Sequence, residues 1–126
     1  MKKLALAMLL AAWAMLLPAL AAGQRFDQAG FDALLKAGKP TLVMVHADWC
    51  PTCRAQEPLI SDLLRTPRYA GIAALRVDFD SQADVVKSFR VVQQSTLIVF
   101  KGGREVGRSI GDTRKESIEA LLKQAL

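Results

Sequence analysis

The chain has 126 residues, of which 52% are hydrophobic, and its 17 Lys and Arg against 12 Asp and Glu give a formal net charge of +5. This length suffices for one domain with a single core and excludes a second domain. The basic residues are spread from Arg25 to Lys123 without forming a patch, so the charge pattern argues against a nucleic-acid-binding protein.

The first residues form a separate apolar segment. Lys2 and Lys3 precede an uncharged run that reaches Pro18 and a stretch of small residues. A basic start, an apolar stretch and an Ala-x-Ala site are typical of a secretory signal peptide. We therefore predict a signal peptide over residues 1–21, a mature domain over residues 22–126, and a location in the periplasm or cell envelope.

The alternative for this segment is an uncleaved membrane anchor, because the 19 residues from Leu4 to Ala22 could just span a bilayer. No cysteine lies near the cleavage site, so we do not expect a lipoprotein. Cleavage would remove Lys2 and Lys3 and lower the formal net charge from +5 to +3.

Helix and strand patterns alternate along the mature chain. The run from Asp27 to Ala37 has one apolar face and predicts a helix, which Gly38-Lys39-Pro40 ends. Thr41–His46 is apolar and β-branched, as in a strand covered on both faces. A second helix is expected from Cys50 to about Arg65.

The second half continues the alternation. We expect strands over Ala73–Asp78 and Thr96–Lys101, a short helix over Gln82–Phe89 between them, a hairpin strand over Arg104–Ser109, and a final helix. Strands separated by helices are expected to pair in parallel, and the last two strands to pair antiparallel. The predicted fold class is therefore α/β, with a mixed central β-sheet flanked by helices.

The only two cysteines, Cys50 and Cys53, are spaced C-x-x-C between a predicted strand and a predicted helix. This places Cys50 at the N-cap and Cys53 at the third helical position, near enough for a disulfide, with Pro51 at the first. The helix dipole and free amides favour the Cys50 thiolate. Cys50 should therefore attack a substrate disulfide as the exposed, readily alkylated thiol, and Cys53 should resolve the mixed disulfide.

A purely structural disulfide is the alternative for this pair. A loop this small would remove little entropy from the unfolded chain and would be a poor stabiliser.

These residues resemble the thioredoxin family over nearly all of the mature chain. The core of the resemblance is Ala47–Arg54, and Pro58, Phe100–Gly103 and Gly111 match the family's kinking proline, hairpin and active-site glycine. The sequence WCPTC is also similar to periplasmic thioredoxins of cytochrome c maturation, which act as reductants.

The resemblance implies a thioredoxin fold and an exported thiol-disulfide oxidoreductase, with reduction as its direction. Its catalytic residues would be Cys50 and Cys53, and their active-site neighbours would be Trp49, Pro51, Thr52 and Glu57. Its partners would be protein disulfide or thiol substrates and a redox partner. We expect a monomer and no cofactor beyond the cysteine pair.

The chain departs from the family at two positions. The substrate-docking loop of Gln94, Ser95 and Thr96 has Ser95 where the family has a cis-proline, and a trans peptide is expected there. Ser95→Pro should fold if the docking surface is retained, and should lose stability if the Ser95 N–H is bonded. Met44 replaces a buried acid, and Glu57 either substitutes through water or is a solvated surface residue.

His46 is the only histidine. With Cys50 and Cys53 it offers three ligands for copper or zinc, but a structural site needs four, so we expect no metal and a partly buried His46 beside Trp49. Trp49 could shield the cysteines and contact substrate, or cap the core.

Two acidic residues, Asp78 and Asp80, are expected to cap the helix near Gln82.

The alternative function for the whole protein is a non-catalytic binding module that holds a partner peptide or a metal on the same surface. The altered Ser95 loop is the best support for this alternative.

Overall fold

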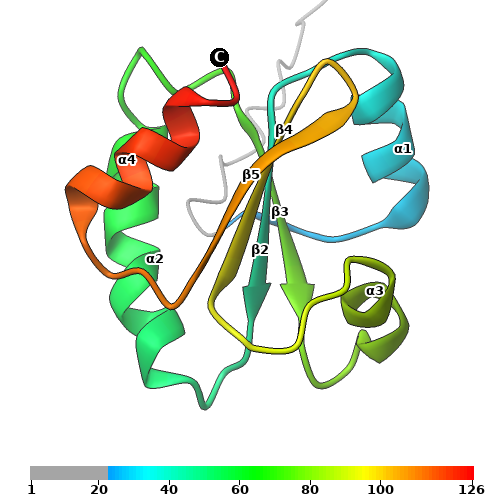
Figure 1. Ribbon diagram of the computed structural model, residues 1–126, viewed down its shortest axis with the longest axis vertical. Helices are drawn as coiled ribbons and strands as arrows, with labels where there is room; N and C mark the ends of the chain where they lie inside the picture. The colour runs from blue at the N-terminus through cyan, green and yellow to red at the C-terminus, as the bar shows by residue number, and fades with distance from the viewer. Residues whose placement is uncertain (1–22) are drawn as a thin grey trace, which may run out of the picture.

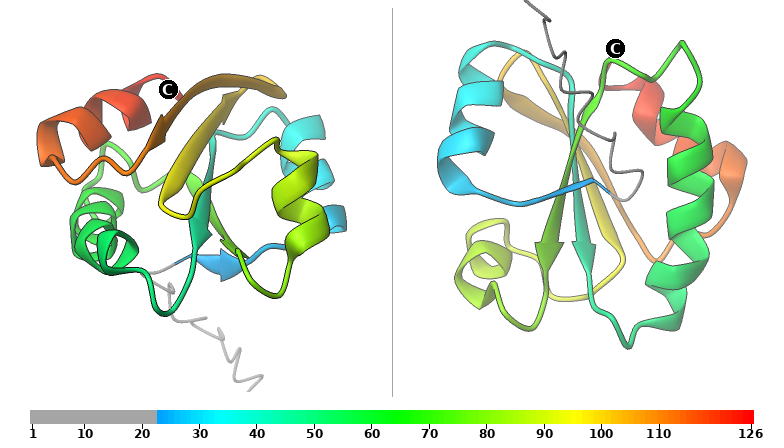
Figure 2. Two further views of the ribbon diagram at one scale, coloured as in Figure 1. Left: turned by 60° about the horizontal axis from the view of Figure 1, so that its bottom comes forward. Right: turned by 180° about the vertical axis from the view of Figure 1, so that it is seen from behind.

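The computed structural model describes residues 23–126, and the predicted signal peptide over residues 1–21 lies outside the described residues. One mixed sheet is covered by two helices on each face (Figure 1, Figure 2). Within residues 23–126, no helix is long and apolar enough to cross a membrane. The strands are β1 (Gln24–Arg25), β2 (Thr41–His46), β3 (Ala73–Asp78), β4 (Thr96–Lys101) and β5 (Arg104–Ile110), and the helices are α1 (Gln28–Lys36), α2 (Pro51–Leu64), α3 (Ala83–Ser88) and α4 (Lys115–Lys123).

The sheet has the strand order β1-β3-β2-β4-β5. Strand β3 pairs in parallel with both β1 and β2, whereas β4 pairs antiparallel with both β2 and β5. The predicted mixed sheet is confirmed, and so are the bounds predicted for β2, β3 and β4. The short strand β1 was not predicted, because two residues are too few to show a pattern.

The expectation that strands separated by helices pair in parallel is wrong for β4. Helix α3 has six residues and rises about 9 Å, whereas the six-residue strand before it spans about 20 Å. The chain therefore does not return to the end of the sheet where β3 begins. It enters β4 at the end where β3 finishes, so β4 runs opposite to β2 and β3 (Figure 1).

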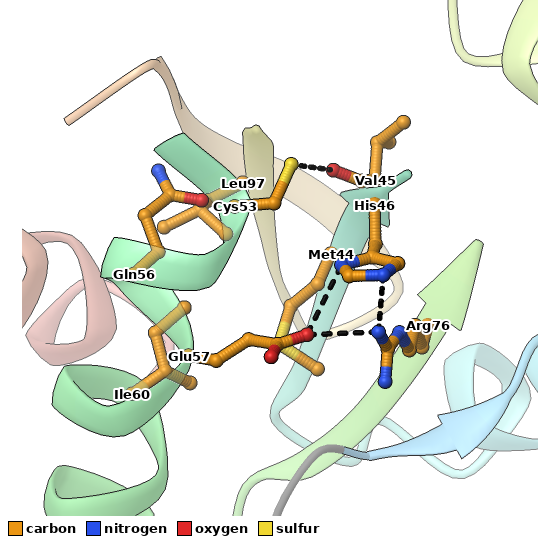
Figure 3. Close-up of a pocket in the computed structure, with 9 residues that line it drawn as sticks. All are labelled: Met44, Val45, His46, Cys53, Gln56, Glu57, Ile60, Arg76 and Leu97. Carbon is orange, nitrogen blue, oxygen red and sulfur yellow. Dashed lines mark hydrogen bonds and ion pairs between the residues drawn. The ribbon is translucent and has the colours of Figure 1, made fainter. Parts of the chain in front are cut away.

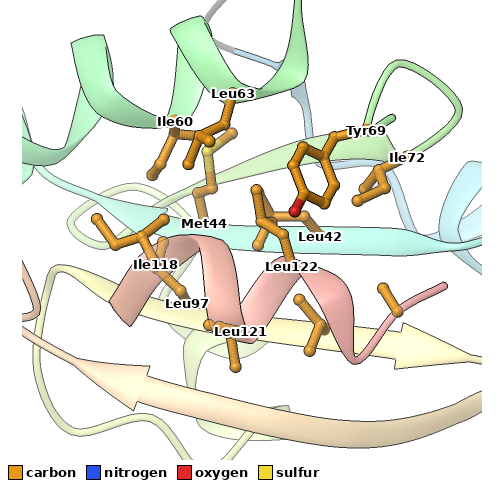
Figure 4. Close-up of a cluster of buried hydrophobic side chains, with 12 residues drawn as sticks. Leu42, Met44, Ile60, Leu63, Tyr69, Ile72, Leu97, Ile118, Leu121 and Leu122 are labelled. Carbon is orange, nitrogen blue, oxygen red and sulfur yellow. The ribbon is translucent and has the colours of Figure 1, made fainter. Parts of the chain in front are cut away.

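Strand β2 is buried along its whole length and divides the core into two layers. Because side chains alternate along a strand, Leu42 and Met44 pack toward α2 and α4, and Val43 and Val45 pack toward α1 and α3. Figure 4 shows the first layer, in which Ile60 and Leu63 of α2 meet the face of the sheet. This packing fixes the carboxyl end of β2 against the start of α2.

Candidate active site

The two cysteines lie where β2 passes into α2, at the lower end of the sheet in Figure 1. Cys50 is the N-cap of α2, and its Sγ accepts a hydrogen bond of 3.1 Å from the Cys53 backbone N–H. Pro51 is the first helical residue and Cys53 the third, so the predicted placement is confirmed. Pro51 is exposed and Thr52 is half-buried. The donated N–H and the helix dipole both stabilise negative charge on the Cys50 sulfur.

Both cysteines are free thiols, and both are buried, with exposed fractions of 5% for Cys50 and 3% for Cys53. The expectation that Cys50 stands exposed is therefore wrong: Cys50 lies against Ala47, Cys53 and the half-buried Phe79. Burial, and then the hydrogen bond with Cys50, raises the pKa of Cys53 from 9.0 to about 11. Cys53 is consequently a protonated thiol at neutral pH and needs a proton acceptor before it can attack a disulfide.

Ser95 lies beside the cysteine pair in a backbone conformation with φ of 59°, and the Gln94–Ser95 peptide is trans, as predicted. Its N–H donates to the Val45 carbonyl at 2.8 Å, and its own carbonyl accepts from the Gly111 N–H at 3.0 Å. The structure therefore meets the condition under which Ser95→Pro is expected to lose stability, since proline has no N–H and cannot adopt a positive φ. Of its neighbours, Gln94 is half-buried and Thr96 is buried.

Gln56 is a site residue that the sequence analysis missed. Its exposed fraction is 3%, and its Nε2 donates to the carbonyls of Ser95 at 3.1 Å and Asp112 at 2.8 Å. It therefore ties α2 to both loops that border the cysteines. Helical spacing could have revealed it, because it lies three residues after Cys53 and four before the buried Ile60.

Glu57 forms a charged cluster behind Cys53 with residues of the two neighbouring strands (Figure 3). Its Oε1 lies 2.8 Å from Arg76 Nη2 and 3.0 Å from His46 Nδ1, and its side chain is 34% exposed. The alternative of a solvated surface residue is therefore wrong. Because Glu57 follows Cys53 by one helical turn, it lies on the same side of α2 as the resolving thiol.

A small cavity separates this cluster from Cys53. It has a volume of about 20 Å³, and its lining includes Cys53, Glu57, His46, Arg76 and Met44 (Figure 3). This volume has room for one water molecule with polar partners on several sides.

His46 is 6% exposed and faces the charged cluster. Its Nε2 lies 2.9 Å from Asp48 Oδ1 and also contacts the Arg76 guanidinium. In residues 23–126, no group of three or more His, Cys, Asp or Glu side chains is arranged to hold a metal ion. The structure thus places His46 with carboxylates and an arginine, and does not join it with the two cysteines as a ligand set.

Trp49 is 56% exposed, so it does not cap the core, and its Nε1 donates to Asp80 Oδ2 at 2.7 Å.

The prediction that Asp78 and Asp80 cap α3 is wrong. Gln82 is the N-cap of α3 and makes no side-chain cap bond there, whereas Asp78 Oδ1 accepts from the N–H groups of Asp80 and Ser81. These bonds, that from Ser81 first, lower the pKa of Asp78. The two hydrogen bonds to Asp78 stabilise the turn after β3.

The comparisons with known proteins agree with this geometry. The family model described as Thioredoxin matches residues 23–124. Thioredoxin H2-1 of Oryza sativa subsp. japonica is 34% identical over 94 residues, which cover 71% of this chain and 67% of that protein. The thioredoxin of Alicyclobacillus acidocaldarius subsp. acidocaldarius is 32% identical over 98 residues, which cover 78% of this chain and 92% of that protein.

Solved structures give the same result. Trxlp from Edwardsiella tarda EIB202 is 39% identical and superposes with a TM-score of 0.77, covering 79% of this chain and 96% of that chain. With its sheet, its cysteine pair at a helix N-terminus and these relatives, the chain belongs to the thioredoxin family and is a thiol-disulfide oxidoreductase.

Proposed function

We propose that this protein is an exported reductase of protein disulfides, with Cys50 as the nucleophile and Cys53 as the resolving thiol. The observation that carries this assignment is the asymmetry of the pair. The Cys50 sulfur caps α2 and accepts an N–H, whereas burial keeps Cys53 protonated. The reducing direction is supported by the similarity of WCPTC to periplasmic reductants, and export by the basic and apolar N-terminal segment.

The reaction has two exchanges. The Cys50 thiolate attacks one sulfur of a substrate disulfide, a mixed disulfide forms, and the other substrate sulfur leaves as a thiolate. Cys53 then loses its proton and attacks the Cys50 sulfur, which releases the second substrate thiolate. The protein is left with a Cys50–Cys53 disulfide, and a dithiol partner must reduce it before the next cycle.

We infer that Glu57 receives the Cys53 proton. It lies on the same side of α2, and both residues line the cavity that has room for one water. A bridging water would pass the proton from the Cys53 sulfur to the carboxylate, which is the role of the acid that Met44 replaces.

Substrate docking would use exposed apolar side chains around the cysteines. Trp49, Val92 and Ile110 are 56%, 82% and 53% exposed, and they belong to loops and a strand end at the same end of the sheet. Because the N–H and carbonyl of Ser95 are already bonded within the protein, a substrate strand cannot pair with that residue. A substrate would therefore dock through contacts with these apolar side chains and through hydrogen bonds with the backbone of Gln94.

The order of the two exchanges predicts which variant traps substrate. Cys53→Ser should accumulate covalent mixed disulfides with proteins of an oxidised envelope extract, because Cys50 still attacks and nothing resolves the bond. Cys50→Ser is the matched control and should trap none. Non-reducing electrophoresis followed by reduction measures both, and a Cys53→Ser protein that traps nothing would favour the binding-module alternative.

The raised pKa of Cys53 predicts selective alkylation. Iodoacetamide reacts with thiolates, so at neutral pH the reduced protein should be modified at Cys50, while labelling of Cys53 should rise about tenfold per pH unit until pH approaches 11. Mass mapping after a brief reaction measures both sites, with Cys50→Ser isolating the second. Equal labelling of the two at neutral pH would contradict the assigned roles.

The hydrogen bond from Ser95 to Val45 predicts the effect of proline. Ser95→Pro should cost about 1–3 kcal/mol because the Val45 carbonyl loses its backbone donor and keeps only the weak contact with the Cys53 thiol, with added strain from the change in φ, and should lower disulfide reductase activity. Ser95→Gly keeps the N–H and accepts a positive φ, so it should retain both stability and activity. Thermal melts and insulin-reduction rates test the pair, and a Ser95→Pro protein as stable as wild type would refute this account of the loop.

A further inference from the structure

Two separate hollows meet at His46 and Arg76. One is the cavity of about 20 Å³ that also contacts Cys53 and Glu57. The other is a polar cleft of about 290 Å³, which includes Asp48 in its lining. The imidazole and the guanidinium therefore form the wall between the buried side of the resolving thiol and a cleft large enough for several water molecules.

The His46 ring has one nitrogen on each side of this wall. Its side chain is 8% exposed, Nδ1 lies 3.0 Å from Glu57 Oε1, and Nε2 lies 2.9 Å from Asp48 Oδ1. Within the described residues, Nδ1 makes no hydrogen bond of good geometry, so it is poised beside Glu57 without being locked to it. Asp48, by contrast, has a side chain that is 93% exposed. One ring thus connects a carboxylate at the cavity with a carboxylate in solvent.

An imidazole held in this way can accept a proton at one nitrogen and release one from the other. We propose that His46 carries the Cys53 proton from the cavity to the polar cleft during the resolving step. This inference rests on the proposed function, because it concerns the second of the two exchanges described there.

The resolving step moves one proton, forms one disulfide bond and breaks another. The Cys53 proton passes through a water in the cavity to the Glu57 and His46 pair, and enters the ring at Nδ1. The transfer starts from the ring tautomer that carries its proton on Nε2 and donates it to Asp48 Oδ1, and this proton leaves to Asp48 and the water of the cleft. The electron pair left on the Cys53 sulfur forms the bond to the Cys50 sulfur, and the bond from Cys50 to the substrate breaks. The substrate sulfur departs as a thiolate.

Charged groups face His46 from the neighbouring elements. Glu57 comes from α2, Asp48 from the loop between β2 and α2, Arg76 and Asp78 from β3, and Arg25 from β1. Arg76 pairs with Glu57 Oε1, and its guanidinium lies beside the His46 ring, so it holds the Glu57 carboxylate at the wall. It is a positioning residue.

The test isolates the resolving step. A mixed disulfide is first formed between Cys50 and a chromogenic aromatic thiol, and the release of that thiol by Cys53 is followed by absorbance. His46→Ala should slow the release about 100-fold, a typical loss for a proton-transfer group. Added imidazole should enter the cleft and restore most of the rate, whereas acetamide should not. His46→Gln, which keeps a polar side chain, should fold and stay slow.

Arg25→Gln is the matched control, because it removes a charge from the same cleft without touching the proposed path, and it should release the thiol at the wild-type rate. Wild-type rates in both His46 variants, or a slow rate that imidazole does not restore, would overturn the role of His46. Failure of the proposed function looks different, since the wild-type protein would then release no more thiol than Cys53→Ser does.

Discussion

The hydrogen bond from the Cys53 N–H to the Cys50 sulfur is the interaction on which the site depends. It makes Cys50 the cap of α2, and it places the second thiol one turn inside the helix, where burial raises its pKa. The bond can form because β2 is buried on both faces and fixes the position of the chain where α2 begins. Two identical side chains acquire different chemistry from their positions at a helix end.

The two departures from the family are met by different residues. At Ser95, the backbone N–H bonds to Val45, and Gln56 reaches across from α2 to bond the Ser95 carbonyl. Near Met44, Glu57 supplies a carboxylate from α2, one helical turn after Cys53, and this carboxylate pairs with Arg76 and His46. The carboxylate that lines the cavity beside Cys53 therefore comes from a helix and not from the strand that carries Met44.

Much of this could be predicted from the sequence, for physical reasons. The strands β2 and β4 have apolar sequences rich in β-branched residues, β3 has a short apolar run that ends in a charged residue, and the C-x-x-C spacing with Pro51 defines a helix start. The antiparallel entry of β4 was missed because it depends on how far α3 carries the chain. The cluster of Glu57, His46 and Arg76 was missed because its members come from three elements, and only the sheet register brings Arg76 beside β2.

The central claim is that this asymmetric pair works as a reductant, and the reduction potential of the Cys50–Cys53 couple tests it most directly. Equilibration with a glutathione or dithiothreitol buffer of known potential, with the two redox forms separated after alkylation, gives the value. We predict a potential near −270 mV, about that of thioredoxin. A potential of about −120 mV, typical of a strong oxidant, would contradict the proposal that the protein reduces its substrates.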